Sequence, residues 1–450
     1  MECGVSKQSV RNLLEVGQGN EIAITAPNRK PLNYNGLRIH VDLIGEQLAS
    51  IGLKNSDRVA IVLPNGPEMA TAFLAVASYM SAAPLNPSYK EAEYEFYLED
   101  LKPKLVIVEE NTSNPVVKAA KKLSIPIAEI SVNKDNAAGE FSLFETRKSI
   151  DIPSIEMESL VLHTSGTTSR PKVVPLTQSN LVASSGNISA TLKLKEADHS
   201  LNIMPLFHLH GLVAVLCASI LAGSSVCCTP GFNALKFFEL ANSQKITWYS
   251  GVPTMHQAIL LRGQRQADVA KALNLRFIRS SSASLPPAVF DELIALFNCP
   301  VIEAYGMTEA THQMTSNPLP PKKQKAGFVG LPAGPEVCIM DVSGNKLVNG
   351  EEGEVCIKGD NVTPGYDKNP EANSQSFTDG WFRTGDQGKF DEDGYLKITG
   401  RLKEIINRGG EKISPLEIDN VLMDHPAIQQ VVSFAVPDKS YGEEIGVAVV

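Results

Sequence analysis

The chain has 450 residues, of which 43% are hydrophobic and 20% are charged, and its formal net charge is −9. These proportions are typical of a globular protein, and the length is sufficient for more than one domain. A net negative charge without a long basic run argues against nucleic-acid binding. The sequence has neither an apolar signal-peptide core near Met1 nor an apolar run that could insert into a membrane. We therefore expect a cytoplasmic protein, with the peroxisome as the alternative.

Seven cysteines are scattered along the chain without a C-x-x-C pair. This spacing argues against a zinc site and against a disulfide framework. An odd number of cysteines also fits a reducing compartment.

Short apolar runs alternate with longer segments of helical spacing over most of the chain. Residues 58–63 form such a run, a Pro-Asn-Gly sequence ends it, and 67–82 has the spacing of a helix. This alternation predicts βαβ units, in which parallel sheets are covered by helices. Further strands are expected at 104–108, 160–162, 247–252 and 275–279, and a buried helix is expected at 211–222.

The pattern changes after about residue 327, where short strands alternate with turns. Residues 337–340 and 353–359 are expected strands, and Ser-Gly-Asn at 343–345 is an expected hairpin turn. The sequence Asp-Glu-Asp-Gly at 391–394 lacks the ligand spacing of a calcium-binding EF-hand loop, so a turn is expected there as well. We therefore predict a smaller β-rich subdomain that ends near Gly400.

The segment 164–172, Thr-Ser-Gly-Thr-Thr-Ser-Arg-Pro-Lys, follows the expected strand at 160–162. Hydroxyl donors, backbone N–H groups at a glycine turn and a lysine together suit a polyphosphate. The segment is not a Walker A loop, because Pro171 rather than glycine precedes Lys172. A Ser/Thr-rich surface loop without function is the alternative, but the strand exit and the placement of Lys172 favour phosphate binding.

Five further motifs follow in a fixed order, and together with the loop they cover nearly the whole chain. They resemble the signature motifs of the acyl-adenylating (ANL) superfamily, and in particular its 4-coumarate–CoA ligase-like group. The loop departs from the usual pattern of that superfamily at Ser169 and Val173, where glycines are more common. The motifs are Pro-Leu-Phe-His at 205–208, Glu-Ala-Tyr-Gly-Met-Thr-Glu at 303–309, Gly-Glu at 353–354 with Gly-Tyr at 365–366, Trp-Phe-Arg-Thr-Gly-Asp at 381–386 and Gly-Arg-Leu-Lys-Glu at 400–404.

The resemblance implies an α/β fold with a large N-terminal domain, residues 1–400, whose parallel sheets are covered by helices. The β-rich subdomain at 327–400 would belong to this domain, and 401–450 would begin a small mobile C-terminal lid domain. Lys403 would be the hinge, and the loop Gly409, Gly410, Glu411 and Lys412 would meet coenzyme A. The lysine that such enzymes use for adenylation is not found before Val450. We therefore expect a truncated lid and slow adenylate formation by this chain.

The resemblance also implies the chemistry, in which a carboxylate attacks the α-phosphorus of ATP and the acyl-adenylate then passes to coenzyme A. Such catalysis depends on preorganised donors, cations and Mg²⁺ around the phosphates. Lys172, Thr308 and Glu309 would act on the phosphates, with Glu309 as the Mg²⁺ ligand. Tyr305 would lie against the adenine, and Asp386 would bind the ribose hydroxyls with help from Arg401. The complete expected nucleotide-binding set is Thr164, Ser165, Gly166, Thr167, Thr168, Lys172, Ala283, Ser284, Glu303, Ala304, Tyr305, Thr308, Asp386 and Arg401.

The acyl-binding residues implied by the resemblance are His208, Ser282 and His312. Ser282 stands where a glycine would leave room for an aromatic ring, and an imidazole at 312 replaces a small or apolar residue. Buried polar groups are costly beside a long acyl chain but can bind a second carboxylate. This pattern is similar to that of the oxalate–CoA ligases, so a small dicarboxylic acid, oxalate, is the expected substrate. The alternatives are a ligase for a hydroxycinnamic or medium-chain fatty acid and a nucleotide-binding remnant without catalysis.

Overall fold

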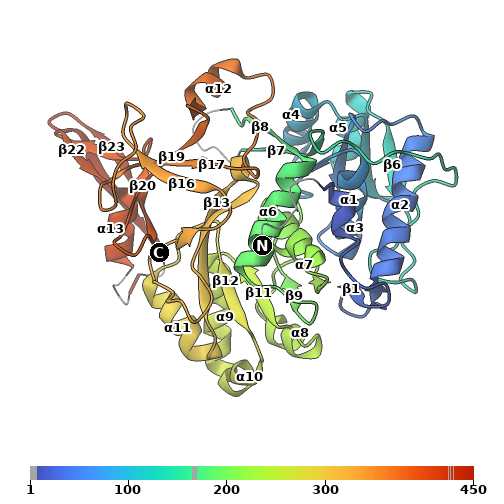
Figure 1. Cartoon of the computed structure of the whole chain (residues 1–450), viewed down its shortest axis with the longest axis horizontal. Coiled ribbons are helices and arrows are strands. Elements are labelled where there is room, and N and C mark those ends of the chain that lie inside the picture. The colour runs from blue at the N-terminus through green and yellow to red at the C-terminus, as the bar shows by residue number, and fades with distance from the viewer. Residues whose placement is uncertain (1–7, 165–169, 424, 426, 429) are drawn as a thin grey trace.

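The computed structural model describes residues 8–164, 170–423, 425, 427–428 and 430–450. Four sheets follow one another across the molecule (Figure 1), from the six-stranded sheet near the blue N-terminal region to a small four-stranded sheet drawn in red. The two large sheets consist mainly of parallel strands with helices beside them, and the two smaller sheets are antiparallel. This architecture confirms the predicted α/β class with a β-rich part.

The six-stranded sheet is built from the apolar runs of the first third of the chain. Its central strands are buried on both faces, which explains why they read as continuous apolar runs rather than as alternating patterns. Strands β7 and β8 close one side as an antiparallel hairpin, and the expected phosphate loop joins them. In spatial order the strands are β6 (Ile127–Ile130), β5 (Leu105–Glu109), β3 (Arg58–Val62), β4 (Ser81–Pro84), β7 (Glu158–His163) and β8 (Val173–Thr177).

Among the expected acyl-binding residues, His312 begins β14 of the nine-stranded sheet and Ser282 follows β12. The six central strands of this sheet run parallel, and an antiparallel unit extends it beyond β13. The carboxyl ends of parallel strands lie at one edge of a sheet, which is where open α/β proteins bind ligands. In spatial order the strands are β15 (Leu331–Pro332), β14 (His312–Ser316), β13 (Val301–Met307), β12 (Phe277–Ser280), β11 (Trp248–Gly251), β9 (His199–Asn202), β10 (Ser225–Cys228), β1 (Ile22–Thr25) and β2 (Leu32–Asn33).

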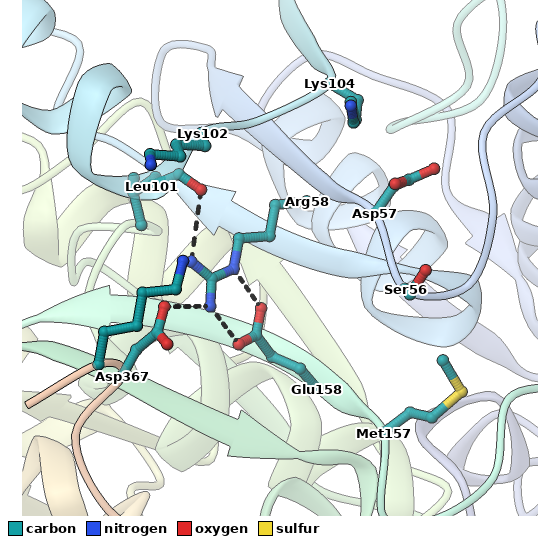
Figure 2. A pocket seen from close by; sticks show the side chains of 10 residues that line it. Ser56, Asp57, Arg58, Leu101, Lys102, Lys104, Met157, Glu158 and Asp367 are labelled. Carbon is teal, nitrogen blue, oxygen red and sulfur yellow. Dashed lines mark hydrogen bonds and ion pairs between the residues drawn. The ribbon is translucent and has the colours of Figure 1, made fainter. Parts of the chain in front are cut away.

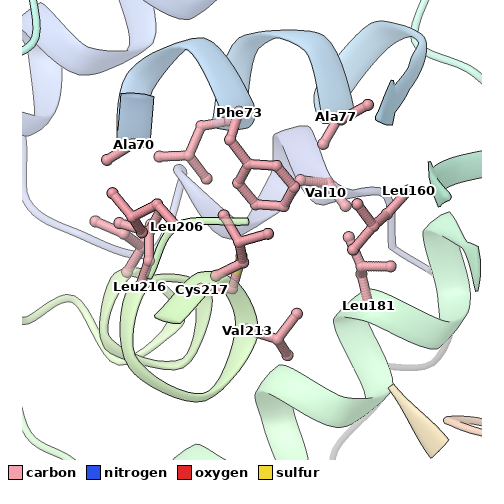
Figure 3. Close-up of a cluster of buried hydrophobic side chains, with 14 of the residues drawn as sticks. Val10, Ala70, Phe73, Ala77, Leu160, Leu181, Leu206, Val213, Leu216 and Cys217 are labelled. Carbon is pink, nitrogen blue, oxygen red and sulfur yellow. The ribbon is translucent and has the colours of Figure 1, made fainter. Parts of the chain in front are cut away.

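Three helical segments contribute to the largest apolar core, as Figure 3 shows. Phe73 of α3 lies among side chains of α6 and of the π-helix η2, which include Leu181 and Val213. The buried helix predicted at 211–222 is confirmed, although it is divided into η2 (His210–Cys217) and α7 (Ala218–Leu221). The remaining α-helices of the described chain are α1 (Val10–Leu13), α2 (Tyr34–Ser50), α3 (Pro67–Tyr79), α4 (Glu91–Leu101), α5 (Val116–Lys122), α6 (Gln178–Thr191), α8 (Phe237–Ser243), α9 (Pro253–Gly263), α10 (Ala267–Ala272), α11 (Pro287–Phe297), α12 (Pro370–Ser376) and α13 (Pro415–Leu422), with 3-10 turns η3 (Gln264–Gln266) and η4 (Thr308–Ala310).

The two antiparallel sheets contain the expected strands at 337–340 and 353–359. The last strand of the chain, β24, pairs with β23 along its length and with β21 at one end. The five-stranded sheet contains β16 (Glu336–Met340), β17 (Gly353–Lys358), β18 (Phe377–Thr378), β19 (Trp381–Phe390) and β20 (Leu396–Arg401). The four-stranded sheet contains β21 (Ile406–Arg408), β22 (Glu411–Ile413), β23 (Val431–Asp438) and β24 (Gly442–Val449). Within the part of the chain that is described, no helix has both the length and the apolar character needed to cross a membrane.

Candidate active site

The two ends of the expected phosphate loop are held together by the β7–β8 hairpin. The Thr164 amide donates to the Lys172 carbonyl over 2.9 Å, and the Lys172 amide donates to Thr164 Oγ1 over 3.0 Å. Ser165, Gly166, Thr167, Thr168 and Ser169 lie outside the described residues. The hairpin therefore fixes where the loop leaves and re-enters the sheet.

Lys172, Tyr366 and Glu309 form a continuous group next to this loop. Lys172 Nζ lies 4.3 Å from the centroid of the Tyr366 ring, and the Tyr366 hydroxyl donates to Glu309 Oε1 over 2.7 Å. Burial raises the pKa of Glu309, whereas the bond from Tyr366 and the charge of Lys172 oppose that rise. Thr308 is half-buried at the start of η4, beside Glu309. Lys172, Thr308 and Glu309, which are expected to bind the phosphates, thus lie near one another. Tyr366 links Lys172 to Glu309, a contact that the sequence did not indicate.

An arginine clamp formed by Arg58 holds Asp367, as Figure 2 shows, and Asp367 follows Tyr366 in the chain. Arg58 Nε and Nη2 each donate to Glu158 over 2.7 Å, and Nη2 also donates to Asp367 Oδ2 over 3.0 Å. The Asp367 amide donates to the Val173 carbonyl over 3.0 Å. These contacts tie residue 367 to the six-stranded sheet and thereby place its neighbour Tyr366. The clamp borders a cavity of about 390 Å³.

A second expected group meets on strands β13, β19 and β20. The Tyr305 hydroxyl donates to Asp386 Oδ2, and Arg401 Nε donates to Asp386 Oδ1 over 2.9 Å. Asp386 and Arg401 are paired residues of adjacent antiparallel strands, which accounts for their contact. Tyr305, expected at the adenine, and Arg401, expected at the ribose, therefore both bind the carboxylate of Asp386.

Glu303 has a structural contact that the sequence did not indicate. Its side chain is buried, its Oε1 accepts a hydrogen bond from the Leu285 amide over 3.0 Å, and its Oε2 has no partner among the described residues. Burial raises the pKa of Glu303 to about 8. In addition, Ser281 Oγ donates to the Ala304 carbonyl over 2.9 Å. Both contacts anchor the loop between β12 and α11. Ala283 and Ser284 lie exposed in this loop.

The expected acyl-binding residues gather around a histidine that the sequence analysis did not select. His210, rather than the exposed His208, lies next to both of the other residues. Its Nδ1 is 3.0 Å from Ser282 Oγ, and its ring centroid is 5.1 Å from that of His312. Burial lowers the pKa of His210 and of His312 well below the usual value for histidine, and the charge of Arg279 lowers both further.

Arg279 is the charged member of this group and is completely buried in β12. Its Nη1 donates to Ser250 Oγ and its Nη2 to Gln313 Oε1, both over 3.3 Å. Nε of Arg279 has no hydrogen-bond partner and the guanidinium has no carboxylate partner among the residues described. Burial lowers the pKa of Arg279 to about 9, so the side chain remains a cation at neutral pH. We call His210, Ser250, Arg279, Ser282 and His312 the polar cluster.

Glycines permit two close backbone approaches that place the histidines. A Cβ on Gly211 would lie 2.5 Å from the Pro205 carbonyl oxygen, and one on Gly306 would lie 1.5 Å from the His312 carbonyl oxygen. Only glycine therefore allows η2 to start against the Pro205 turn and allows β13 to lie against the first residue of β14. A sequence signal for the cluster did exist, because Arg279 directly follows the apolar pair Phe277-Ile278 within a strand.

Residues expected to act with coenzyme A lie beyond the five-stranded sheet. Lys403 is exposed in the turn between β20 and β21. Gly409 and Gly410 form the turn of the β21–β22 hairpin with φ of 60° and 99°, values that favour glycine. Glu411 and Lys412 follow on β22 and are exposed. The hinge and the coenzyme A loop remain predictions.

Comparison with known proteins gives the family. The sequence pattern of the AMP-binding enzyme family matches residues 15–367. The chain is 45% identical to an oxalate–CoA ligase from Arabidopsis thaliana, over 95% of this chain and 87% of the relative. It is 43% identical to an oxalate–CoA ligase from Saccharomyces cerevisiae, over 88% of this chain and 77% of the relative.

Solved structures agree with this result. ATP-bound MatB from Rhodopseudomonas palustris superposes with a TM-score of 0.88 at 26% identity, over 98% of this chain and 88% of that chain. The o-succinylbenzoate CoA synthetase MenE from Bacillus subtilis, in complex with its acyl-adenylate, gives a TM-score of 0.85 at 26% identity, over the same shares. With its two large sheets, its ordered motifs and these matches, the chain belongs to the AMP-binding enzyme family.

Proposed function

We propose that this protein joins oxalate to coenzyme A in an ATP-dependent reaction that proceeds through an oxalyl-adenylate and releases AMP. One oxalate carboxylate attacks the α-phosphorus of ATP and pyrophosphate leaves. The thiol of coenzyme A then attacks the activated carbonyl, and AMP leaves. The relatives named as oxalate–CoA ligases support this substrate.

The observation that carries the choice of acid is the uncompensated charge of Arg279. A buried cation without a carboxylate partner is costly, because it has lost its hydration and has gained no opposite charge. The second carboxylate of oxalate would supply that charge when the first is activated. Ser282 is exposed and His312 has a buried Nδ1 without a partner among the residues described, so both are suited to contact the acid. A long or aromatic acyl group would instead leave these polar atoms unpaired.

The nucleotide side of the reaction is assigned to the two groups around Glu309 and Asp386. Lys172 would balance the phosphate charge, Thr308 would donate to the α-phosphate, and Asp386 would accept from the ribose hydroxyls. Asp386 accepts from Tyr305 and Arg401, so bonds to the ribose hydroxyls would replace or share these contacts. The remaining residues of the expected set, including Ala283, Ser284 and Ala304, would line the path of the adenosine.

Magnesium fits the site through Glu309. Mg²⁺ is usually held by one or two carboxylates together with phosphate oxygens and water, so a protein cage is not required. A single carboxylate next to Lys172 and the loop ends satisfies that chemistry, and no cluster of three or more metal-ligating side chains occurs in the described part of the chain. When bound, the ion would neutralise charge that develops on the phosphates.

The test is a complete reaction with identified products. The protein is incubated with ATP, Mg²⁺, coenzyme A and oxalate, and AMP and the thioester are measured by liquid chromatography and mass spectrometry. We expect oxalyl-CoA and AMP in equal amounts, and neither product when oxalate is omitted. Oxalate-independent AMP formation, or ATP binding without any turnover, would contradict the proposal and favour a nucleotide-binding remnant.

A further inference from the structure

Four residues of the polar cluster form an unbroken row of hydrogen bonds from the interior to the surface. Arg279 Nη1 lies 3.3 Å from Ser250 Oγ, which lies 2.6 Å from His210 Nε2. His210 Nδ1 lies 3.0 Å from Ser282 Oγ. Arg279, Ser250 and His210 are buried, whereas Ser282 is exposed. The row therefore connects a fixed internal cation to the residue that is positioned to contact the acid.

The fold aligns these side chains rigidly. Ser250 and Arg279 are paired residues of the parallel strands β11 and β12, so their side chains emerge side by side on one face of the sheet. His210 is the first residue of η2, and Asn202 Nδ2 donates to the carbonyl of its neighbour Gly211 over 3.1 Å. Arg279 and Ser250 are thus held by strands, and His210 is held by a helix start that is itself fixed to a strand.

Arg279 sets the direction of the row, because a guanidinium can only donate hydrogen bonds. Ser250 Oγ accepts from Arg279, so the Ser250 hydroxyl proton is free to point to His210 Nε2. If Nε2 carried the ring proton instead, Ser250 would accept twice and its own proton would have no acceptor among the described residues. A buried donor without an acceptor has lost its hydration and gained no hydrogen bond in return, so this arrangement is unfavourable. The neutral ring of His210 is therefore protonated on Nδ1.

The last bond of the row determines what Ser282 offers to a ligand. His210 Nδ1–H donates to Ser282 Oγ, so the Ser282 hydroxyl proton is directed away from the histidine. Ser282 also has a φ of 73°, a left-handed conformation that is unfavourable for a residue with a side chain. A side chain at this position therefore strains the backbone, which a glycine would not do. In return, serine supplies a hydroxyl donor.

We propose that Arg279, Ser250 and His210 form a hydrogen-bond relay that turns the hydroxyl proton of Ser282 toward the distal carboxylate of the acid. Arg279 and Ser250 are then positioning residues for substrate selection, although neither touches the substrate. The inference rests on the proposed function, because the relay ends at a carboxylate that a monocarboxylic acid lacks. It goes beyond that function because it assigns a tautomer to His210 and positioning roles to Arg279 and Ser250.

The direct test is the tautomer of His210 in the substrate-free protein. Nitrogen-15 spectra of histidine-labelled protein distinguish a ring protonated on Nδ1 from one protonated on Nε2, and a His210→Asn spectrum assigns the signal. We expect the Nδ1-protonated ring in the wild type and loss of this preference in Ser250→Ala. An Nε2-protonated ring in the wild type would overturn the relay.

The functional test compares Ser250→Ala with Ser280→Ala. Ser280 is a buried serine of β12 whose hydroxyl has no partner among the described residues, so it is a matched control outside the relay. We expect Ser250→Ala to raise KM for oxalate about tenfold, equivalent to one lost hydrogen bond of about 1.4 kcal/mol, with KM for ATP unchanged. Ser280→Ala should leave both constants unchanged. Equal effects of the two variants on oxalate would overturn the relay.

A conservative variant separates charge from hydrogen-bond direction. Arg279→Lys keeps a cationic donor and should retain most of the oxalate use and the His210 tautomer, whereas Arg279→Met should lose both. The relay would be contradicted if both Arg279→Lys and Arg279→Met lost the Nδ1-protonated form of His210 and yet both kept the wild-type KM for oxalate. Because the tautomer is measured without substrate, its outcome is independent of whether oxalate proves to be the preferred acid.

Discussion

The ring of His210 lies edge-on to the ring of His312, with their centroids 5.1 Å apart. The two rings come from the start of η2 and the start of β14, and His312 has a φ of 99° that only a strongly constrained backbone maintains. Burial lowers the pKa of each ring, and the charge of the nearby Arg279 lowers it further. This arrangement concentrates hydrogen-bonding capacity where other acids would require apolar contacts.

Removing the His312 ring should impair oxalate use selectively. His312→Ala deletes the proposed contact to the acid but none to the nucleotide groups, so kcat/KM for oxalate should fall about 30- to 100-fold, equivalent to roughly 2–3 kcal/mol. ATP affinity, measured by isothermal titration, should change less than twofold. His199→Ala is the control, because His199 bonds Thr25 Oγ1 on another part of the sheet. Equal losses of oxalate use and ATP binding would make His312 a structural residue.

Replacing Ser282 by glycine should separate stability from selectivity. The change removes a side chain from a left-handed position, which relieves about 1 kcal/mol of backbone strain, although glycine also makes the unfolded chain more flexible. The melting temperature of Ser282→Gly should therefore stay close to that of the wild type. Its kcat/KM for oxalate should fall at least tenfold, because the hydroxyl donor is lost. A variant that melts much earlier, or one that keeps full oxalate activity, would refute this assignment.

Arg279→Met should stabilise the protein while it abolishes efficient oxalate use. The substitution replaces a buried cation without a carboxylate partner by an apolar side chain of similar length. Apolar replacement of buried ion pairs is often neutral or stabilising by about 1–4 kcal/mol, and here no partner charge is left behind. The matched control is Arg276→Met, since Arg276 pairs with Asp198 over 2.8 Å and its loss should lower the melting temperature. Thermal unfolding and oxalate kinetics are measured for both variants. A strong fall in the melting temperature of Arg279→Met would show that the charge is compensated in the folded protein.

Glu303 should make stability depend on pH between about 4.5 and 8. Its folded-state pKa of about 8 exceeds the value of 4.5 expected in the unfolded chain, so the folded state binds the proton more tightly. Stability from this group is complete below pH 4.5 and is lost as pH rises toward 8. We therefore expect the melting temperature of the wild type to fall relative to Glu303→Gln over this range. Glu292→Gln, an exposed control on α11, should show no such pH-dependent difference.

Much of the fold was predictable because its strands are apolar on both faces and its motifs mark the strand ends. The runs at 58–63 and 104–108 became adjacent parallel strands, as alternation with helical segments predicts. The contact of Asp386 with Arg401 also followed from motifs on neighbouring strands. The strands could be located from the local order of apolar and polar residues, and the contact of Asp386 with Arg401 was expected from the resemblance of two motifs.

The polar cluster could be predicted only in part, because it depends on register and on backbone approach. Two histidines stand close together in the sequence at 208 and 210, and motif position favoured His208. The start of η2 turns His210 inward because Gly211 allows contact with Pro205. Ser250 and Arg279 became neighbours through the pairing of β11 with β12, which no motif specifies. The pairing of Tyr366 with Glu309 likewise depends on the Arg58 clamp from a distant strand.

A direct competition between acids tests whether the polar cluster selects oxalate. The protein is given ATP, Mg²⁺ and limiting coenzyme A with equal concentrations of oxalate, malonate, 4-coumarate and a medium-chain fatty acid. The ratio of the thioesters formed reports the ratio of the kcat/KM values. We predict that oxalyl-CoA is the main product. A mixture dominated by any of the other three thioesters would show that the polar cluster does not select oxalate.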